Sequence, residues 1–120
     1  MPFKFEKLEI WNLAVDLADE VHVLTRKFPK EEMFSLTSQF KRASDSIALN
    51  IAEGSIGQTN PEQRRFMGFS IRSSAECVTC LYLARKRNYI DDAEFDLFYK
   101  KLELLFAKMN KFRSLLTTVR

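Results

Sequence analysis

Apolar residues in the last thirty positions of the chain repeat at helical spacing. Their separations alternate between three and four residues without a break, which is the heptad pattern of a helix that packs along one stripe. Tyr99 and Phe106 lie beside this stripe and widen it, which is typical of a bundle core or of a core with a subunit contact. We expect the helix to begin at Asp91 or Asp92. Its stripe consists of Phe95, Phe98, Leu102, Leu105, Met109, Phe112, Leu116 and Val119.

The first half of the chain predicts two helices. One extends from about residue 6 to residue 27, and Pro29 ends it because a residue before proline disfavours helical geometry. The other begins after Ser35, a good N-cap residue, and Gly54 and Gly57 interrupt its pattern. The short link predicts that the two helices are antiparallel neighbours. The first stripe contains Leu8, Trp11, Ala14, Val15, Ala18, Val21 and Phe28, and the second contains Leu36, Phe40, Ala43, Ile47, Asn50 and Gly54, with Ile51 beside it.

A third predicted helix has clear start and stop signals. Thr59 or Asn60 can cap it, Pro61 suits its first turn, and Asn88 is the expected stop. Four amphipathic helices joined by short links predict an all-α fold, an antiparallel up-down-up-down four-helix bundle that forms a single domain over residues 1–120. The stripe of the third helix contains Phe66, Phe69, Ser73, Glu76, Cys80 and Leu83.

Polar residues occupy expected core positions of the second and third helices. Asn50 and Glu53 lie in the second helix, and Ser73 and Glu76 lie in the third. Buried polar residues can fix the register of a bundle, and a binding site is the alternative interpretation. Counted from the intervening loop, the two sets are offset by about 12 Å, so contact across a subunit boundary would pair them more easily than contact within one chain. A buried Glu needs a donor, and the candidates are Arg42 and Arg72.

The sequence offers few residues for catalysis or metal binding. The single histidine, His22, leaves no Ser-His-Asp constellation to assemble, and the Glu-x-x-His pairs of a di-iron bundle are missing. Cys77 and Cys80 lie in mid-helix without a second pair for zinc, so we expect buried free thiols. The Gly-x-x-Gly run lacks the Lys-Ser or Lys-Thr of a phosphate loop. We therefore expect a structural, partly buried histidine, no catalytic residue, no metal and no cofactor.

Charge is distributed unevenly along the chain. The net charge is +3, with −2 in residues 1–60 and +5 in residues 61–120. This asymmetry indicates an anionic partner or, alternatively, an ordinary solvated helix surface. No apolar run approaches the roughly 18–20 residues that cross a bilayer, and the N-terminus lacks the layout of a signal peptide. We expect a soluble, cytoplasmic, bacterial protein with no membrane partner.

The second predicted helix carries a recognisable pattern, Leu36-Thr37-Ser38-Gln39-Phe40-Lys41-Arg42-Ala43, Ser46-Ile47 and Asn50-Ile51-Ala52-Glu53-Gly54. It resembles the signature of the four-helix bundle proteins of the 23S rRNA intervening-sequence family. The resemblance covers essentially the whole chain, although Leu49 stands where the family often has a small residue. Further matches are Leu8, Trp11, Ala14, Phe28-Pro29, Phe66, Ser73, Glu76 and Tyr89-Ile90.

The resemblance implies an antiparallel bundle that assembles into a homopentamer and has no established enzymatic activity. Family members are encoded within intervening sequences of bacterial 23S rRNA genes or elsewhere in bacterial genomes. Related bundles are accessory proteins of diversity-generating retroelements, where a basic pentamer is thought to bind nucleic acid and the reverse transcriptase. The resemblance therefore adds a homo-oligomer, and nucleic acid or a protein, to the expected partners.

Basic residues of the third and fourth predicted helices are the candidate contacts with nucleic acid. We expect a non-enzymatic oligomer that binds structured RNA or DNA through this surface and tolerates different sequences, because no base-reading motif is evident. The alternative is a protein-interaction scaffold or accessory subunit that does not bind nucleic acid. The expected contacts are Arg64, Arg65, Arg72, Lys100, Lys101, Lys108, Lys111 and Arg113.

Overall fold

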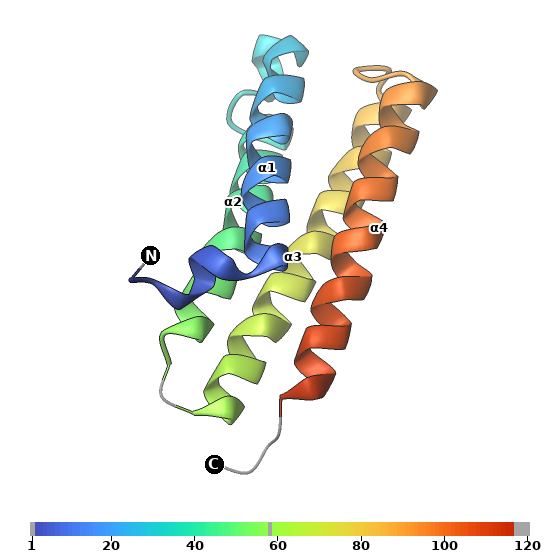
Figure 1. Cartoon of the computed structure of the whole chain (residues 1–120). Coiled ribbons are helices and arrows are strands. Elements are labelled where there is room, and N and C mark those ends of the chain that lie inside the picture. Colours follow the sequence, from blue (N-terminus) through green and yellow to red (C-terminus); the bar gives the residue numbers. More distant parts are fainter. Residues whose placement is uncertain (1, 58, 117–120) are drawn as a thin grey trace.

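The computed structural model describes residues 2–57 and 59–116, and every regular element within these ranges is helical. Figure 1 shows that successive α-helices run in opposite directions, so the predicted four-helix bundle is confirmed. The α-helices are α1 (Glu9–Leu24), α2 (Leu36–Ser55), α3 (Asn60–Lys86) and α4 (Asp92–Leu115). Short 3-10 helices flank α1, namely η1 (Lys4–Lys7), η2 (Thr25–Lys27) and η3 (Lys30–Glu32).

The bundle is elongated, and its helices do not pack equally closely. It measures 47 × 22 × 22 Å along its principal axes. The interface between α2 and α3 is the most extensive, whereas α1 and α4 make far fewer contacts with each other. Small buried side chains, including those of Ala43, Ser44, Ser70 and Ser74, allow this close approach of α2 and α3. Within the described ranges, no helix has the length and apolar character needed to cross a membrane.

Gly54 lies in the last turn of α2, so the predicted interruption of the helix comes one residue later than expected. A Cβ atom built at this position would lie 2.8 Å from Cβ of Phe66 on α3. The glycine therefore serves close helix packing, because any larger residue would push the two backbones apart. Helix α2 ends one residue later, at Ser55, and the N–H of Gly57 then donates to the carbonyl group of Gly54 at 3.1 Å.

Helix α1 begins later than predicted, and the predicted stripe is confirmed only in part: Ala14, Ala18, Val21 and Phe28 are buried. Leu8 has an extended backbone, so the residues before it form η1 and not the first turn of α1. Val15, which the prediction placed in the core, is 38% exposed, and Trp11 is only half-buried. The stripe that faces the core is Ile10, Ala14, Leu17, Val21, Leu24 and Phe28.

The core stripe predicted for α3 is wrong by one residue. Its members Glu76 and Leu83 are exposed, and Phe66 and Phe69 are half-buried. Serine and cysteine supply much of the true core face, so the hydrophobic pattern favoured the neighbouring line of aromatic residues. The residues that face the core at helical spacing are Met67, Ser70, Ser74, Cys77, Leu81 and Ala84, with Ser73 and Cys80 buried beside them.

The stripe predicted for α4 is confirmed from Phe95 to Met109, where all its members are buried. Phe112 and Leu116 are half-buried, and Val119 lies outside the described residues. In α2 the stripe continues through Ile51, which is fully buried, rather than through Asn50, which is half-buried.

The predicted ends of α3 and the predicted start of α4 are confirmed. The side chain of Thr59 caps α3, and Asp91 forms a capping box with Glu94 at the start of α4. Asn88 adopts a left-handed backbone with φ 62°. The N–H groups of Asn88 and Tyr89 donate to carbonyl groups in the last turn of α3, which is the Schellman arrangement.

The start of α2 differs from the prediction. Ser35 precedes the helix, but its side chain does not cap it. Instead, Oε1 of Glu32 accepts hydrogen bonds from the N–H of Leu36 at 3.3 Å and from the hydroxyl of Ser35 at 2.7 Å. A carboxylate thus replaces the expected hydroxyl, and its negative charge interacts favourably with the positive end of the helix dipole.

Candidate nucleic-acid interface

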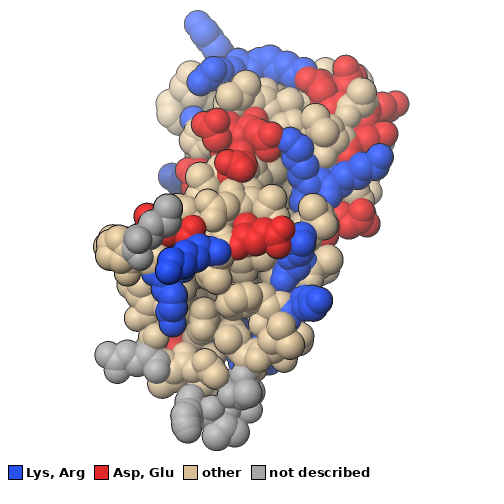
Figure 2. All heavy atoms as spheres, viewed as in Figure 1, with Lys and Arg blue, Asp and Glu red and all other residues tan. Residues whose placement is uncertain are grey.

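The basic residues predicted to contact nucleic acid do not form one continuous surface. Lys101 donates to Glu20, and Nζ of Lys108 lies 3.2 Å from Oε1 of Glu9. Both lysines of α4 are therefore paired with carboxylates of α1. Figure 2 shows Lys and Arg interspersed with Asp and Glu on the visible face. The surface formed by α1 and α4 consequently offers little unpaired positive charge to a polyanion.

Arg64 and Arg113 join the start of α3 to the end of α4. Nη1 of Arg64 donates to the carbonyl oxygens of Arg113 at 2.6 Å and of Leu116 at 3.2 Å. In return, Nε of Arg113 donates to the carbonyl oxygen of Arg64 at 3.0 Å. Carbonyl groups at a helix C-terminus carry partial negative charge, so the Arg64 guanidinium stabilises this helix end. Both arginines are half-buried and hold the two helices together.

Arg65 and Arg72 are exposed and share one aromatic neighbour. Cζ of Arg65 lies 5.5 Å from the ring centroid of Phe69, and Cζ of Arg72 lies 6.0 Å from the same centroid. Cation–π attraction at these distances favours positions of both guanidinium groups beside the ring. Neither arginine forms an ion pair within the described part of the chain.

These four arginines surround a surface hollow of about 370 Å³ where the first half of α3 meets the end of α4. Pro61, Gly68 and Phe69 complete the lining. Among the described residues, no carboxylate lines this hollow. We refer to it as the arginine hollow, defined by Arg64, Arg65, Arg72 and Arg113.

Lys100 and Lys111 lie outside the arginine hollow. Both are exposed on α4, and no ion pair involves them in residues 2–57 and 59–116. The predicted contacts thus fall into three groups: the arginines of the hollow, the two lysines without an acidic partner, and the two lysines paired with α1.

The predicted structural polar residues lie in two different environments. Nδ2 of Asn50 and Oγ of Ser73 each donate to Oγ of Ser46 at 2.9 Å. Ser46 therefore connects α2 to α3 within one chain, and no subunit boundary is needed. Glu53 and Glu76 are exposed, so their predicted core positions are wrong. In α2 the predicted stripe is buried at Phe40, Ala43 and Ile47, but Glu53 lies outside it, whereas in α3 the core face is displaced by one residue from the prediction. No ion pair joins either glutamate to an arginine in the described ranges.

Glu32 is a buried carboxylate that the hydrophobic pattern did not reveal. Its Oε2 accepts hydrogen bonds from the hydroxyl of Tyr89 at 2.7 Å and from Nη1 of Arg87 at 3.1 Å. The bond from Tyr89, followed by that from Ser35, lowers the pKa of Glu32, although burial acts in the opposite direction. The same bond raises the pKa of Tyr89. Because both carboxylate oxygens are bonded within the protein, this cluster ties two interhelical connections together.

Cys77 and Cys80 are free and buried, as predicted. Burial raises the pKa of the Cys80 thiol to about 11 and also raises the pKa of Cys77. Both thiols are therefore protonated near neutral pH, which disfavours nucleophilic attack and metal binding. Within the described ranges, no group of three or more His, Cys, Asp or Glu side chains is arranged to hold a metal ion.

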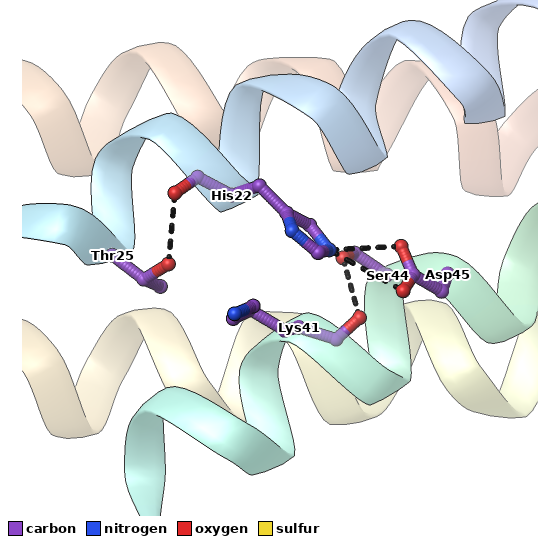
Figure 3. A network of polar contacts seen from close by, with 5 residues as sticks. All are labelled: His22, Thr25, Lys41, Ser44 and Asp45. Carbon is purple, nitrogen blue, oxygen red and sulfur yellow. Dashed lines mark hydrogen bonds and ion pairs between the residues drawn. The ribbon is translucent and has the colours of Figure 1, made fainter. Parts of the chain in front are cut away.

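His22 pairs with an acidic residue of the neighbouring helix. Nε2 of His22 lies 3.1 Å from Oδ1 of Asp45, and the two side chains point toward one another between α1 and α2 (Figure 3). The hydroxyl of Thr25 donates to the carbonyl group of His22 at 3.1 Å. The histidine is half-buried, as expected, and links α1 to α2.

Two apolar hollows lie on different sides of the bundle. The first, of about 460 Å³, lies beside α1 and α2 and includes Trp11, Val15 and Leu49. The second, of about 330 Å³, lies between α3 and α4 and includes Tyr99 and Phe106, the predicted second apolar edge. Leu49 is 67% exposed and Phe106 is 44% exposed, so both surfaces present apolar side chains to solvent.

Residues 6–111 match the family model described as 23S rRNA-intervening sequence protein. The match spans α1, α2, α3 and most of α4, and it includes every residue of the arginine hollow except Arg113. No curated protein matches the chain.

Proposed function

The chain belongs to the 23S rRNA-intervening sequence protein family, and we propose that it binds nucleic acid, either structured RNA or DNA, without catalysing a reaction. The observation that supports this proposal is that some basic side chains of α3 and α4 form ion pairs with carboxylates and others do not. Carboxylates neutralise the lysines facing α1, whereas Arg65, Arg72, Lys100 and Lys111 have no ion-pair partner in the described ranges.

Phosphate contacts of this kind give affinity without sequence recognition. Each cation that neutralises a phosphate releases a condensed counterion, so binding weakens as the salt concentration rises. The arginines and lysines are on helices α3 and α4, and no additional motif suggests reading of base edges. We therefore expect similar affinities for different sequences of the same shape. We also propose that the protein acts in the cytoplasm of a bacterial cell.

Fluorescence anisotropy with a labelled RNA hairpin, duplex RNA and duplex DNA tests this proposal. We expect binding at about 50 mM salt that weakens steeply by about 150 mM. A matched control is the double variant Glu20→Gln/Lys101→Gln, which removes one ion pair without changing the net charge; its affinity should equal that of the wild type. Absence of binding to all three probes at low salt would refute the proposal.

Assembly into a homo-oligomer, proposed to be a pentamer, would strengthen this binding. Five chains with a net charge of +3 would carry about +15, which raises the local attraction for a polyanion. The apolar hollows on two sides of the bundle support head-to-tail contact between copies, and such contacts form a ring where the rotation between successive copies closes. Light scattering should give a mass several times that of one chain, and Leu49→Asp should lower it. A monomeric wild type would refute assembly.

A protein-interaction scaffold is the second candidate function, and a separate observation favours it. Phe34, in the connection between α1 and α2, is 92% exposed, and its neighbour Met33 is 50% exposed. Exposed apolar side chains of this size are frequent at protein interfaces. This function predicts weak binding to every nucleic acid, together with a specific partner whose binding is lost in Phe34→Ser.

A further inference from the structure

We propose that the arginine hollow binds a single phosphate group of the nucleic acid, and this inference rests on the proposed nucleic-acid binding. The hollow would thus be a defined anchoring site, distinct from the diffuse attraction exerted by Lys100 and Lys111. The ligand of the hollow is a phosphate group of the nucleic acid, either at the end of a nucleic-acid strand or within its sugar–phosphate backbone.

The charges around the hollow support an anionic ligand. Four guanidinium groups line it, and no carboxylate does so among the described residues. The apolar hollows differ in this respect, because Asp45 lines the one beside α1 and α2 and Glu103 lines the one between α3 and α4. Glu76, one helical turn after Arg72, forms no ion pair with it in the described ranges. An incoming phosphate therefore does not compete with a carboxylate of residues 2–57 or 59–116.

The two inner arginines are fixed in place but retain unused donors. Arg64 uses Nη1 for the carbonyl groups at the end of α4, and Arg113 uses Nε for the carbonyl group of Arg64. No hydrogen bond within the described residues involves Nη2 of Arg64 or either terminal nitrogen of Arg113. The bonds that position these guanidinium groups thus leave donors for a phosphate oxygen.

The two outer arginines are positioned by Phe69. Its ring lies beside both guanidinium groups, and Arg65 also lies 5.6 Å from the ring centroid of Phe66. Ordering two long side chains in advance lowers the entropy lost when they bind a ligand. A planar guanidinium with several fixed donors also matches phosphate oxygens better than an ammonium group does. The arrangement of the arginines therefore favours binding of a phosphate group over binding of anions that are attracted by positive charge alone.

Gly68 keeps the floor of the hollow open. This half-buried glycine lies between the exposed arginines on α3, and Cβ built there would lie 3.8 Å from Nε and Nη2 of Arg113. With no side chain on α3 at this point, the Arg113 guanidinium remains accessible from the hollow. A large residue at this position would fill the space that a phosphate group needs.

The first experiment compares two double variants that each remove two positive charges. Arg65→Ala/Arg72→Ala alters the hollow, and Lys100→Ala/Lys111→Ala alters exposed lysines of α4; circular dichroism verifies folding of both. Binding of one RNA hairpin is measured by anisotropy with a 5′-phosphate and with a 5′-hydroxyl. We expect the arginine variant to lose at least about fivefold more affinity than the lysine variant, because guanidinium–phosphate bonds are stronger and better oriented.

The two hairpins distinguish the sources of the phosphate. A wild-type preference for the 5′-phosphate that disappears in Arg65→Ala/Arg72→Ala identifies a chain end, whereas equal affinity for both hairpins with the same arginine dependence identifies the backbone. As a second measurement, inorganic pyrophosphate should raise the melting temperature of the wild type and of the lysine variant, but not of the arginine variant. Wild-type binding with equal losses in both double variants would overturn the phosphate site and leave the proposed function standing. Failure of the wild type to bind any RNA or DNA would overturn the proposed function itself.

Discussion

Arg64 and Arg113 each donate a hydrogen bond to the backbone carbonyl group of the other, although 49 positions separate them in the chain. This reciprocal pair holds the first turns of α3 against the last turn of α4. It also places two guanidinium groups at one end of the bundle, where the exposed Arg65 and Arg72 complete the arginine hollow. A structural bond and a candidate binding site therefore use the same side chains.

Replacement of Arg64 should destabilise the protein. Arg64→Ala removes charge-assisted bonds to the carbonyl groups of two half-buried residues, and we expect a loss of about 1–2 kcal/mol in the free energy of unfolding. Urea denaturation followed by circular dichroism measures this change. The neighbouring Arg65→Ala, which removes an exposed arginine, should cost less than about 0.5 kcal/mol. Equal stability of both variants would show that the reciprocal pair contributes nothing.

The two glycines that lie inside helices should respond in opposite ways to alanine. Gly54→Ala places a Cβ atom 2.8 Å from Cβ of Phe66, so overpacking should destabilise the protein by about 1–3 kcal/mol. Gly68→Ala meets only ordinary contacts at 3.8 Å and should stabilise α3 by up to about 1 kcal/mol. Thermal and urea unfolding of the two variants test this difference, and a stabilising Gly54→Ala would contradict the close contact between α2 and α3.

Two leucines of α3 test which face of this helix is buried. Leu81 is fully buried and Leu83 is 38% exposed. We expect Leu81→Ala to lower the free energy of unfolding by about 2–5 kcal/mol, because it leaves a cavity. Leu83→Ala should cost less than about 1 kcal/mol. The opposite order in urea denaturation would restore the stripe predicted from the sequence.

Glu32 should make stability depend on pH in the acidic range. Its pKa is lowered in the folded state, so its contribution is fully present above the ordinary pKa of glutamate in the unfolded chain. That contribution is lost as the pH falls through the lowered pKa of the folded protein. Glu32→Gln should therefore weaken the acid-dependent loss of stability. Tyr89→Phe should move this loss to higher pH, because the largest cause of the lowered pKa is removed.

Measurement of unfolding free energy in urea from neutral to acidic pH tests both variants. Glu53→Gln is the matched control, since it removes an exposed carboxylate from the same half of the chain. Identical pH profiles for the wild type, Glu32→Gln and Glu53→Gln would contradict a role for Glu32.

Helical periodicity was sufficient to predict the bundle, but not the face that each helix buries. In α4 the large residues from Phe95 to Met109 left no ambiguity. In α3 the core face contains Ser70 and Ser74, which satisfy their hydroxyl groups by donating to the carbonyl groups of Ile47 and Ile71. Such positions look polar in the sequence because their hydrogen-bond partners are not visible there. The predicted stripe of α3 therefore follows the neighbouring aromatic residues Phe66 and Phe69.

The candidate interface was predicted as a set of residues rather than as an arrangement. The sequence indicates basic positions on two helices, but the ion pairs of Lys101 and Lys108 depend on which helix lies opposite them. The arginine hollow depends in the same way on the meeting of two distant chain segments. Glu32 lacked any periodic signal, because it lies in a short 3-10 helix within a connection.

Arginine footprinting with phenylglyoxal, with and without a bound RNA hairpin, tests the account most directly. Mass spectrometry reports the modification of each exposed arginine, so residues elsewhere on the chain serve as internal controls. We predict that RNA protects Arg65 and Arg72, while Arg26 and Arg42, which are exposed outside the arginine hollow, remain as reactive as in the free protein. Equal modification of Arg65 and Arg72 with and without saturating RNA would contradict binding at this surface.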